Sequence, residues 1–397
     1  MVRNQLSTQL EYGGISQERL LCRNWPSLLN FVDQIRENSQ KHFEEAGPLD
    51  EAAGPLVLFG AVEVNFHLWR VLEHSGLKAS YFCDNNPILK HQRVSGLEVL
   101  PPDELPALDG VQVLTAVKWE REMSEQMRSL GIERFFGLQD LRVYEQRWLA
   151  QNAAFIGTHA EELAAVFQQL ADDHSRLVLL NVLKGRLLVG DSRSALYKMI
   201  MQGNQYWALP SFQDMAGAVY VDAGASMGDT IESFIYNNSA GFKKIWAFEP
   251  SVDYYRRLEH QINRLSSVFG FDRQRVTCTP KGLARESGPA VGKRIYFDYL
   301  GVDGGNFPFE AVDLDSWPFP EPVDIIKADI EGFEEPMLQG AENLIRQWKP
   351  KLALCLYHRP EDFFSLPLYL KKLVPEYKMA IRHHSPTYAE TVLYCWT

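Results

Sequence analysis

The sequence has few cysteines, no long apolar segment and no excess of positive charge. Its five cysteines are far apart, odd in number and without paired spacing, which predicts reduced thiols and neither a disulfide framework nor a zinc site. No apolar run approaches about eighteen residues and no basic-then-apolar signal opens the chain, so we expect a cytoplasmic protein without a membrane span. The net charge of -11 argues against a basic surface that contacts a phosphate backbone, so we expect no nucleic-acid partner.

Length and composition indicate a folded chain of two domains. The 397 residues are many for a single core, and 46% hydrophobic with 23% charged residues is typical of soluble globular proteins. Hydrophobic patterning predicts a helical segment over residues 1–50, a small α/β domain over 51–140, a helical bridge or lid over 141–210 and a larger α/β domain over 211–397.

A glycine-rich turn follows the apolar residues 218–221 and is the most informative stretch of the chain. It reads Asp222-Ala223-Gly224-Ala225-Ser226-Met227-Gly228-Asp229-Thr230. Glycine lets the backbone approach a ligand or take a positive φ, and aspartate and threonine often begin helices. In doubly wound sheets, ligands bind beyond the carboxyl end of such a strand. The turn therefore predicts a ligand site.

The next predicted strand, residues 244–248, ends at Glu249 and Pro250. An acid about twenty residues after the turn lies where nucleotide-binding sheets hold ribose hydroxyls. A helix N-terminus attracts anions such as pyrophosphate, but the two acids Asp222 and Asp229 would repel one. They suit the positively charged ammonium group of a methionine instead. The pattern predicts S-adenosylmethionine (SAM) as cofactor, although each acid taken singly could be a cap or a solvated loop carboxylate.

Residues 54–140 show a second, smaller α/β pattern. It consists of predicted strands at 56–59, 79–83, 111–117 and 135–136 and a helix at 66–74. A dinucleotide fingerprint would need glycines where Val62 and Asn65 stand, and Glu63 adds charge where a pyrophosphate would lie. We expect no NAD here. A sugar or nucleotide-sugar contact at residues 84–86, packing and dimerisation stay open as roles.

Two later strands carry polar residues at their carboxyl ends. A buried strand over 323–328 ends at Asp329 and Glu331, and a strand over 352–357 ends at His358. Because central parallel strands share one carboxyl edge, Asp329 and His358 are expected in one crevice.

Further segments are expected around this crevice. Gly282 follows a strand at 275–279, where backbone groups could meet the edge of an adenine, and residues 294–306 predict a hairpin inserted over the site. The strands at 379–382 and 392–395 have no helix between them, which indicates an antiparallel last strand. Residues expected to face the acceptor are Gln205, Tyr206, Tyr357, His383 and His384.

With these motifs in this order, residues 205–397 resemble the FkbM-type methyltransferases. The matching motifs are Val221-Asp222-Ala223-Gly224-Ala225, Gly228-Asp229-Thr230, Ala247-Phe248-Glu249-Pro250, Leu314-Asp315-Ser316, Ile326-Lys327-Ala328-Asp329-Ile330-Glu331-Gly332, Gly340-Ala341-Glu342 and Tyr357-His358-Arg359-Pro360-Glu361-Asp362. The resemblance implies a class I methyltransferase fold, a Rossmann-like doubly wound α/β sheet, with SAM as methyl donor and O-methylation, often of sugars or polyketide-like products. Ala328 and Phe333 depart from the pattern without removing an acid.

The sequence thus predicts an O-methyltransferase that acts on a hydroxyl of a saccharide or other polar small molecule, with the N-terminal domain aiding recognition or forming a homodimer.

Histidine suits the base because its pKa lies near neutrality, so Asp329 and His358 are predicted to flank the acceptor, with Glu331 helping to bind or orient it. Asp329 could instead orient the cofactor, or pair with Lys327 or Arg359 while His358 caps its strand. The predicted cofactor residues are Asp222, Ala223, Gly224, Ala225, Ser226, Gly228, Asp229, Thr230, Glu249, Pro250, Gly282 and Asp329.

Two other functions stay open from the sequence. One is an NAD- or nucleotide-sugar-dependent sugar-modifying enzyme that uses the N-terminal domain, against which the missing glycines count. The other is a non-catalytic protein that binds SAM or a sugar, which would require loss of acids that are present.

Overall fold

The computed structural model divides the chain into two compact units. The C-terminal unit comprises residues 1–29, 158–292 and 307–397, and the N-terminal unit comprises residues 30–157 and 293–306. The structure describes residues 20–40, 48–61, 65, 68–69, 72–73, 75–94, 96–115, 120–137, 140, 142–188, 190–213, 215–293 and 306–397. Each unit is described by itself.

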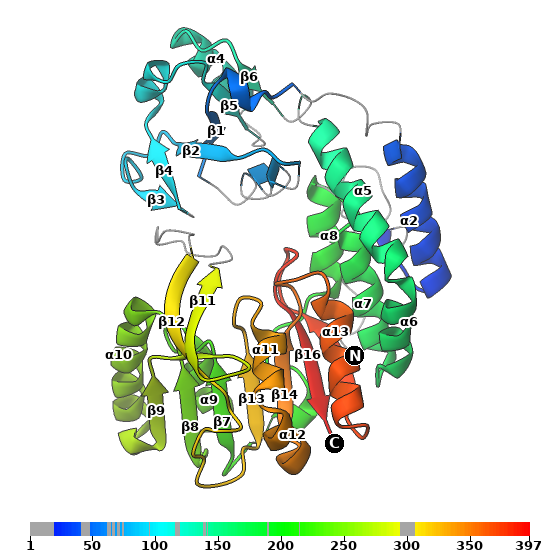
Figure 1. The fold of residues 1–397 in the computed structure, drawn as a ribbon, viewed down its shortest axis with the longest axis vertical. Helices are drawn as coiled ribbons and strands as arrows, with labels where there is room; N and C mark the ends of the chain where they lie inside the picture. The colour runs from blue at the N-terminus through cyan, green and yellow to red at the C-terminus, as the bar shows by residue number, and fades with distance from the viewer. Residues whose placement is uncertain are drawn as a thin grey trace, which may run out of the picture. The chain divides into compact units, whose positions relative to one another are not determined.

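The C-terminal unit is built on a seven-stranded sheet in the order β15-β16-β14-β13-β7-β8-β9 (Figure 1). Its strands are β7 (Val219–Ala223), β8 (Lys244–Phe248), β9 (Val276–Thr279), β13 (Ile325–Ala328), β14 (Lys351–Cys355), β15 (Lys378–His383) and β16 (Thr391–Trp396). The strands from β14 to β9 pair in parallel. β16 is antiparallel to both β14 and β15. The predicted doubly wound sheet with an antiparallel last strand is confirmed.

Helices cover this sheet, so its central strands are apolar runs and not alternating patterns. β7 and β13 are buried at every position, as parallel strands covered on both faces should be. The helices after the strands are α9 (Asp229–Asn237), α10 (Val252–Phe269), α11 (Glu334–Gln339), α12 (Glu342–Trp348) and α13 (Asp362–Leu373). α10 shows how the sequence sets their bounds: the Ser251 side chain accepts the N–H of Tyr254 at its start, and Gly270 ends it with a left-handed backbone.

Three further helices precede β7 in the chain, and one of them packs on the edge strand β15. They are α6 (Ala160–Gln169), α7 (Asp173–Gly185) and α8 (Gly190–Ile200), whereas α5 (Arg142–Thr158) falls in the N-terminal unit up to residue 157. α7 packs on β15, where Arg382 donates to Asp172 at 3.1 Å and to Ser175 at 2.6 Å. The segment expected as one helical bridge is thus shared between the two units, and its second part is fixed to the edge of the C-terminal sheet.

The N-terminal unit contains a six-stranded sheet in the order β3-β4-β2-β1-β5-β6. Its elements are β1 (Leu56–Phe59), β2 (Ala79–Cys83), β3 (Arg93–Val94), β4 (Leu97–Leu100), β5 (Gln112–Leu114), α4 (Glu120–Ser129) and β6 (Phe135–Phe136), together with the part of α2 (Trp25–Gln40) from residue 30 onward. Its strands pair in parallel, except β3 with β4, which are antiparallel. The Rossmann-like pattern is confirmed. The antiparallel β3–β4 pair was missing from the prediction, and most of the predicted helix at 66–74, with Val62 and Glu63, lies outside the described residues.

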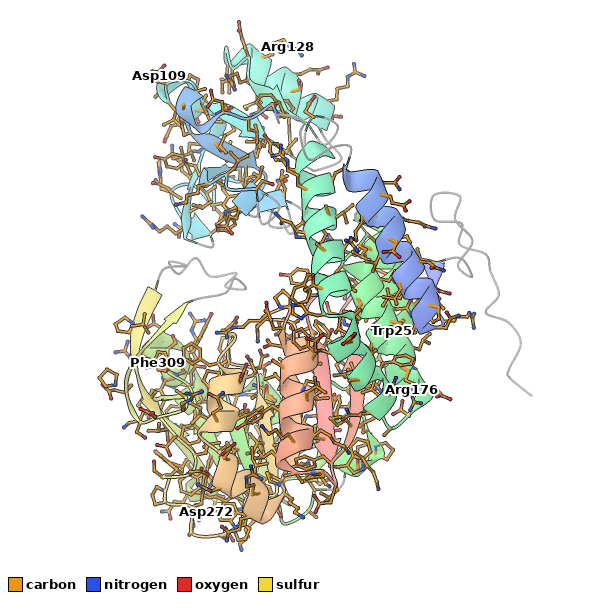
Figure 2. The ribbon with its side chains drawn as sticks, turned by 45° about the vertical axis from the view of Figure 1, so that its right-hand side comes forward. Trp25, Asp109, Arg128, Arg176, Asp272 and Phe309 are labelled. Carbon is orange, nitrogen blue, oxygen red and sulfur yellow. The ribbon has the colours of Figure 1, made fainter. Side chains whose placement is uncertain are left out.

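A small three-stranded sheet, β10-β12-β11, completes the fold. Its strands are β10 (Gly282–Leu283), β11 (Gly288–Lys293) and β12 (Asn306–Val312), and short 3-10 turns are η1 (Glu51–Ala53), η2 (Pro102–Ala107), η3 (Pro210–Phe212) and η4 (Arg273–Arg275). A Cβ on Gly282 would lie 2.3 Å from the ring of Phe309, so a side chain there would clash. Phe309 is labelled in Figure 2. Of the hairpin predicted at 294–306, residues 294–305 lie outside the described chain. No helix in the described part has the length and apolarity of a membrane span.

Candidate active site

The glycine turn after β7 brings the ends of three strands together. Gly224 has a φ of +74°, and a Cβ at this position would lie 1.9 Å from the carbonyl oxygen of Asp329. The backbone N–H groups of Gly224 and Ala225 both donate to the carbonyl oxygen of Phe248, each at 3.0 Å. Gly228, with a φ of +92°, precedes α9 as its N-cap. Glycine is therefore required at position 224 by both its backbone conformation and its neighbour.

Glu249, at the end of β8, holds the same turn. Its Oε2 accepts the N–H of Ser226 at 2.9 Å and its Oε1 accepts the N–H of Ser251 at 2.8 Å. Burial raises the pKa of this carboxyl, and the two N–H donors act in the opposite direction. Each carboxylate oxygen has a further lone pair, so Glu249 can support the turn and still accept a ligand hydroxyl.

Asp222 is fully buried beneath the turn and pairs with Lys327. Lys327 Nζ lies 3.0 Å from Asp222 Oδ1 and donates to the carbonyl oxygen of Gly224 at 2.7 Å. Burial raises the pKa of Asp222, which Lys327 offsets only in part. Burial alone would lower the pKa of Lys327, but Asp222 and Asp329 together raise it. The expected contact of Asp222 with a methionine ammonium does not fit this arrangement, whereas Asp229 is exposed.

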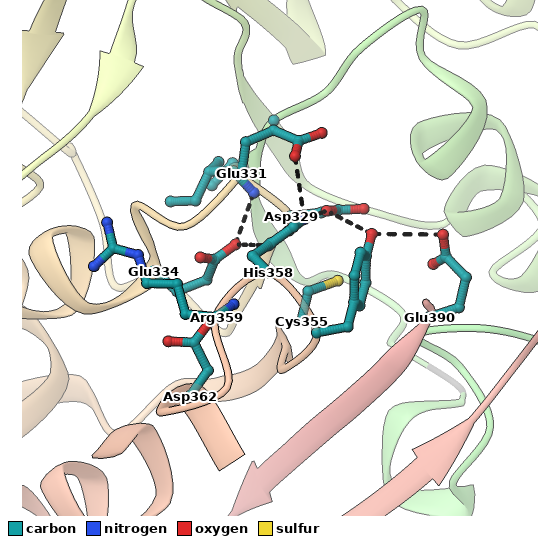
Figure 3. A network of polar contacts seen from close by, with 12 residues as sticks. Asp329, Glu331, Glu334, Cys355, His358, Arg359, Asp362 and Glu390 are labelled. Atoms are coloured by element: carbon teal, nitrogen blue, oxygen red, sulfur yellow. Dashed lines mark hydrogen bonds and ion pairs between the residues drawn. The ribbon is translucent and has the colours of Figure 1, made fainter. Parts of the chain in front are cut away.

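The ends of β13 and β14 bring three acids and one histidine together (Figure 3). His358 Nδ1 lies 2.9 Å from Glu334 Oε1, and His358 Nε2 lies 3.3 Å from Asp329 Oδ1 and 3.5 Å from Glu331 Oε2. Burial lowers the pKa of His358, but the charges and hydrogen bonds of Glu334 and Asp329 outweigh it and raise the pKa well above its usual value. The predicted meeting of Asp329 and His358 at one edge agrees with this geometry.

Asp329 also accepts two tyrosine hydroxyls. Tyr206 Oη donates to its Oδ2 at 2.9 Å, and Tyr357 Oη donates to its Oδ1 at 3.1 Å. Burial alone would raise the pKa of Asp329, but the hydrogen bond and charge of His358 and the charge of Lys327 hold it well below its usual range. Asp329 is thus an anion held by donors from two segments of the chain, one with Tyr206 and one with Tyr357 and His358.

Glu390 joins this network from the turn between β15 and β16. Gln205 Nε2 donates to its Oε2, and Tyr357 Oη donates to its Oε1 at 3.5 Å. Burial, followed by the charge of Asp329, raises the pKa of Glu390 to about 7. No sequence pattern indicates this residue, because a single glutamate in a polar turn belongs to no periodic pattern or motif.

Four residues at this edge have a left-handed backbone without being glycine. Their φ angles are +66° at Tyr206, +46° at Ser226, +56° at Glu331 and +64° at Glu390. Such a conformation costs about 1–2 kcal/mol per residue and is frequent at functional sites, where the surrounding structure maintains it. Backbone strain in the glycine turn and in three segments of the Asp329–Glu390 network marks this edge as the candidate active site.

The structure brings some predicted residues to this site and leaves others apart from it. His383, predicted to face the acceptor, is fully buried with Nδ1 2.9 Å from Thr391 Oγ1. Both imidazole nitrogens of His384 are engaged, by the Gln202 carbonyl oxygen at 2.9 Å and Tyr394 Oη at 3.0 Å. Glu334, for which the sequence predicted no role, lies inside it, and Lys327, expected as a possible partner of Asp329, pairs with Asp222. Lys327 had a usable signal, since a lysine within a buried apolar strand needs a charged partner.

The seven-stranded order with an antiparallel strand between β14 and β15, together with a glycine turn after β7, defines a class I methyltransferase fold. Residues 222–382 match the family model of the Methyltransferase FkbM domain. This part of the chain is therefore similar to methyltransferase domains of the FkbM type. The match includes Asp329 and His358, while Tyr206 and Glu390 lie outside it.

Solved structures agree with this fold. Methyltransferase FkbM from Methylobacillus flagellatus KT has a TM-score of 0.61 and 22% sequence identity, and the alignment covers 94% of this chain and 98% of that chain. An rRNA methylase from Streptococcus thermophilus, at 14% identity and a TM-score of 0.30, covers 46% of this chain and 86% of its own. A putative methyltransferase from Streptococcus mutans in complex with SAH has 9% identity and a TM-score of 0.30, and the alignment covers 53% of this chain and 100% of that chain. The last two similarities are too low to support an argument. No curated protein matches the chain.

Proposed function

We propose that the protein transfers a methyl group from SAM to a hydroxyl of a saccharide or another polar small molecule. The observation that carries this proposal is the network of Asp329, Tyr206, Tyr357 and Glu390 beside the glycine turn of an FkbM-type domain. Its groups are hydrogen-bonding oxygens, which suit a polyhydroxylated acceptor better than an apolar one. The left-handed residues support a functional role for this edge.

The cofactor is proposed to lie along the glycine turn. Glu249 would accept the ribose hydroxyls, because its carboxylate ends β8 beside the turn that it holds through Ser226. Gly224, whose backbone lies directly against Asp329, would let the methionine end approach the main chain closely. The exposed Asp229 is a candidate partner for the ammonium group, in place of the buried Asp222.

Proton removal is proposed to belong to Glu390 and not to His358. Both ring nitrogens of His358 face carboxylates, so neither points to an acceptor. Glu390 has a carboxylate with spare lone pairs and a pKa of about 7, which suits a general base at neutral pH. In the proposed step the acceptor oxygen attacks the methyl carbon, the carbon–sulfur bond breaks, S-adenosylhomocysteine leaves and the hydroxyl proton passes to Glu390.

The N-terminal unit is proposed to recognise the acceptor or to form a homodimer. In this unit Asp84 Oδ2 accepts the backbone N–H of Ala61 at 2.9 Å and Oδ1 accepts that of Asn86 at 2.8 Å. Asp84 thus ties two turns together at the position where an NAD-binding sheet would offer an acid to ribose, which supports a role other than NAD binding.

Calorimetry with SAM and the full chain tests the cofactor. We expect one SAM per chain, with Glu249→Ala weakening binding by about 1.5–3 kcal/mol, because a hydrogen bond to a charged group is lost. Glu122→Ala, at an exposed position of α4, is the matched control and should bind as wild type. Transfer of labelled methyl from SAM to a panel of saccharides and other polyhydroxylated compounds then tests the reaction. Absence of SAM binding would refute the proposal, and methyl transfer to an amine alone would refute its acceptor.

A further inference from the structure

We propose that His358 Nε2, Asp329 and Glu331 bind one divalent metal ion, with Mn²⁺ as the matching probe. The sequence predicted no metal, because these ligands come from the ends of two strands and have no paired spacing. The structure brings them to one point at the edge of the sheet (Figure 3). Within the described residues, Asp329, Glu334 and His358 also form a cluster in which one possible ligand atom from each residue lies within 4.8 Å of the others.

The spacing around Nε2 is close to that of a metal site. Nε2 lies 3.3 Å from Asp329 Oδ1 and 3.5 Å from Glu331 Oε2. Ligands at about 2.1 Å in octahedral geometry have neighbours about 3 Å apart, so a movement of a few tenths of an ångström would let these atoms share an ion. One imidazole nitrogen with carboxylate oxygens is a ligand set that accepts Mn²⁺ and related divalent ions.

Glu334 holds the ring nitrogen of His358 that would not bind the metal. Its Oε1 lies 2.9 Å from His358 Nδ1 and also accepts the backbone N–H of Ile330 at 2.9 Å, and the side chain is fully buried. A ligating histidine almost always donates its other ring N–H to a carboxylate or carbonyl, which fixes the tautomer and turns the free nitrogen toward the metal. Glu334 therefore directs Nε2 toward Asp329 and Glu331. Its Oε2, also buried, has no hydrogen-bond partner in the described structure.

Charge and exposure fit the same assignment. Asp329, Glu331 and Glu334 place three carboxylates around a single imidazole, while the nearby Lys327 is paired with Asp222. The side chains of Asp329 and Glu331 are 26% and 46% exposed, whereas His358 is 2% exposed. The protein thus covers one side of the proposed ion and leaves the other side open for water or an acceptor oxygen.

The chemical role of the ion rests on the proposed function. A divalent ion that binds the acceptor hydroxyl would lower its pKa and fix its oxygen in front of the methyl group. Glu390, on the far side of Tyr357 from Asp329, would then take the released proton. Binding of the ion by the chain is independent of SAM and of any acceptor.

Electron paramagnetic resonance of Mn²⁺ added to the chelator-treated full chain tests the site without SAM or acceptor. We expect one bound Mn²⁺ per chain and a nitrogen coupling from the His358 imidazole. Glu331→Gln should weaken Mn²⁺ binding by about tenfold or more, the range found for loss of supporting groups at metal sites. Because Glu331 is half exposed, this variant should fold. His358→Gln should abolish the nitrogen coupling.

Glu361→Gln is the matched control, since Glu361 is exposed and makes no side-chain cap bond on α13. It should bind Mn²⁺ as wild type. Absence of bound Mn²⁺ in the wild-type chain would overturn the proposal, as would Mn²⁺ affinity unchanged in Glu331→Gln. Methyl transfer that persists in excess chelator would leave the proposed function standing and remove the ion from the reaction, so the two proposals fail separately.

Discussion

Lys327 Nζ lies 3.0 Å from Asp222 Oδ1, and their Cα atoms are direct partners in the parallel pairing of β13 with β7. Both side chains are buried. The ion pair therefore joins the strand that ends in the glycine turn to the strand that ends in Asp329. Lys327 also donates to the carbonyl oxygen of Gly224, so a single cation supports the expected cofactor turn from below.

Removal of this cation should destabilise the protein strongly. Lys327→Met leaves Asp222 as an uncompensated buried charge, which costs about 3–5 kcal/mol of unfolding free energy. Lys349→Met is the control, because its pair with Glu376 is exposed at both ends and should contribute little to the unfolding free energy. Urea unfolding of both variants measures the difference. Equal and small losses in the two variants would show that the buried pair does not support the fold.

Alanine at position 224 should damage the site far more than alanine at another left-handed glycine. Gly224 and Gly270 have similar φ angles, +74° and +69°, but a Cβ on Gly270 meets nothing within 4 Å. Gly270→Ala should cost about 1–2 kcal/mol of backbone strain only. Gly224→Ala also forces Asp329 away from the turn, so its cost should be clearly larger and SAM binding should be lost. Thermal unfolding measures the stability of the two variants, and calorimetry measures their SAM binding. Equal stabilities together with intact SAM binding in Gly224→Ala would contradict the close approach of Gly224 to Asp329.

His383 should make stability depend on pH in the acidic range. Burial lowers its pKa to about 4 in the folded chain, against an unperturbed value of about 6.5 when unfolded. As the pH falls below 6.5, the unfolded chain takes up a proton that the folded chain refuses, so the unfolding free energy decreases until about pH 4. From pH 7.5 to pH 5 the loss should be about 2 kcal/mol greater in wild type than in His383→Gln. If wild type and His383→Gln showed the same pH dependence in urea unfolding, His383 would not be the source of the acid sensitivity.

Replacement of the proposed base should lower turnover without loss of the cofactor. Glu390→Gln keeps the size of the side chain and removes its capacity to accept a proton, so turnover should fall about 100-fold or more. SAM affinity should stay near that of wild type. Glu376→Gln, at an exposed surface position, serves as control. Near-normal turnover of Glu390→Gln, measured with an identified acceptor, would assign proton removal to another group or to water.

The main architecture was predictable because each rule used is local or follows from strand order. The glycine turn, the acid after β8 and the acids after β13 each follow a short buried strand. The rule that parallel strands share a carboxyl edge then placed Asp329 and His358 together. The short β3–β4 pair was missed, since strands of two and four residues give too little periodicity to detect.

The errors arise from side-chain direction and from register. Asp222 was expected to face a ligand, but its position in the fully buried β7 directs it into the interior beside Lys327. The sequence does not show which residues of β7 and β13 are partners. His383 was expected to face the acceptor, yet it ends a strand whose last five positions are buried. Glu390 depends on the left-handed turn after β15, which no pattern in the sequence indicates.

A crystal structure of the full chain with S-adenosylhomocysteine would test the central claim most directly. The account predicts the ribose within hydrogen-bond distance of the Glu249 carboxylate, the methionine end along Gly224 and Ala225, and the sulfur on the side of Asp329. Electron density for the ligand elsewhere in the C-terminal unit, or in the sheet of the N-terminal unit, would contradict the proposed cofactor site and with it the assignment of Asp329 and Glu390 to methyl transfer.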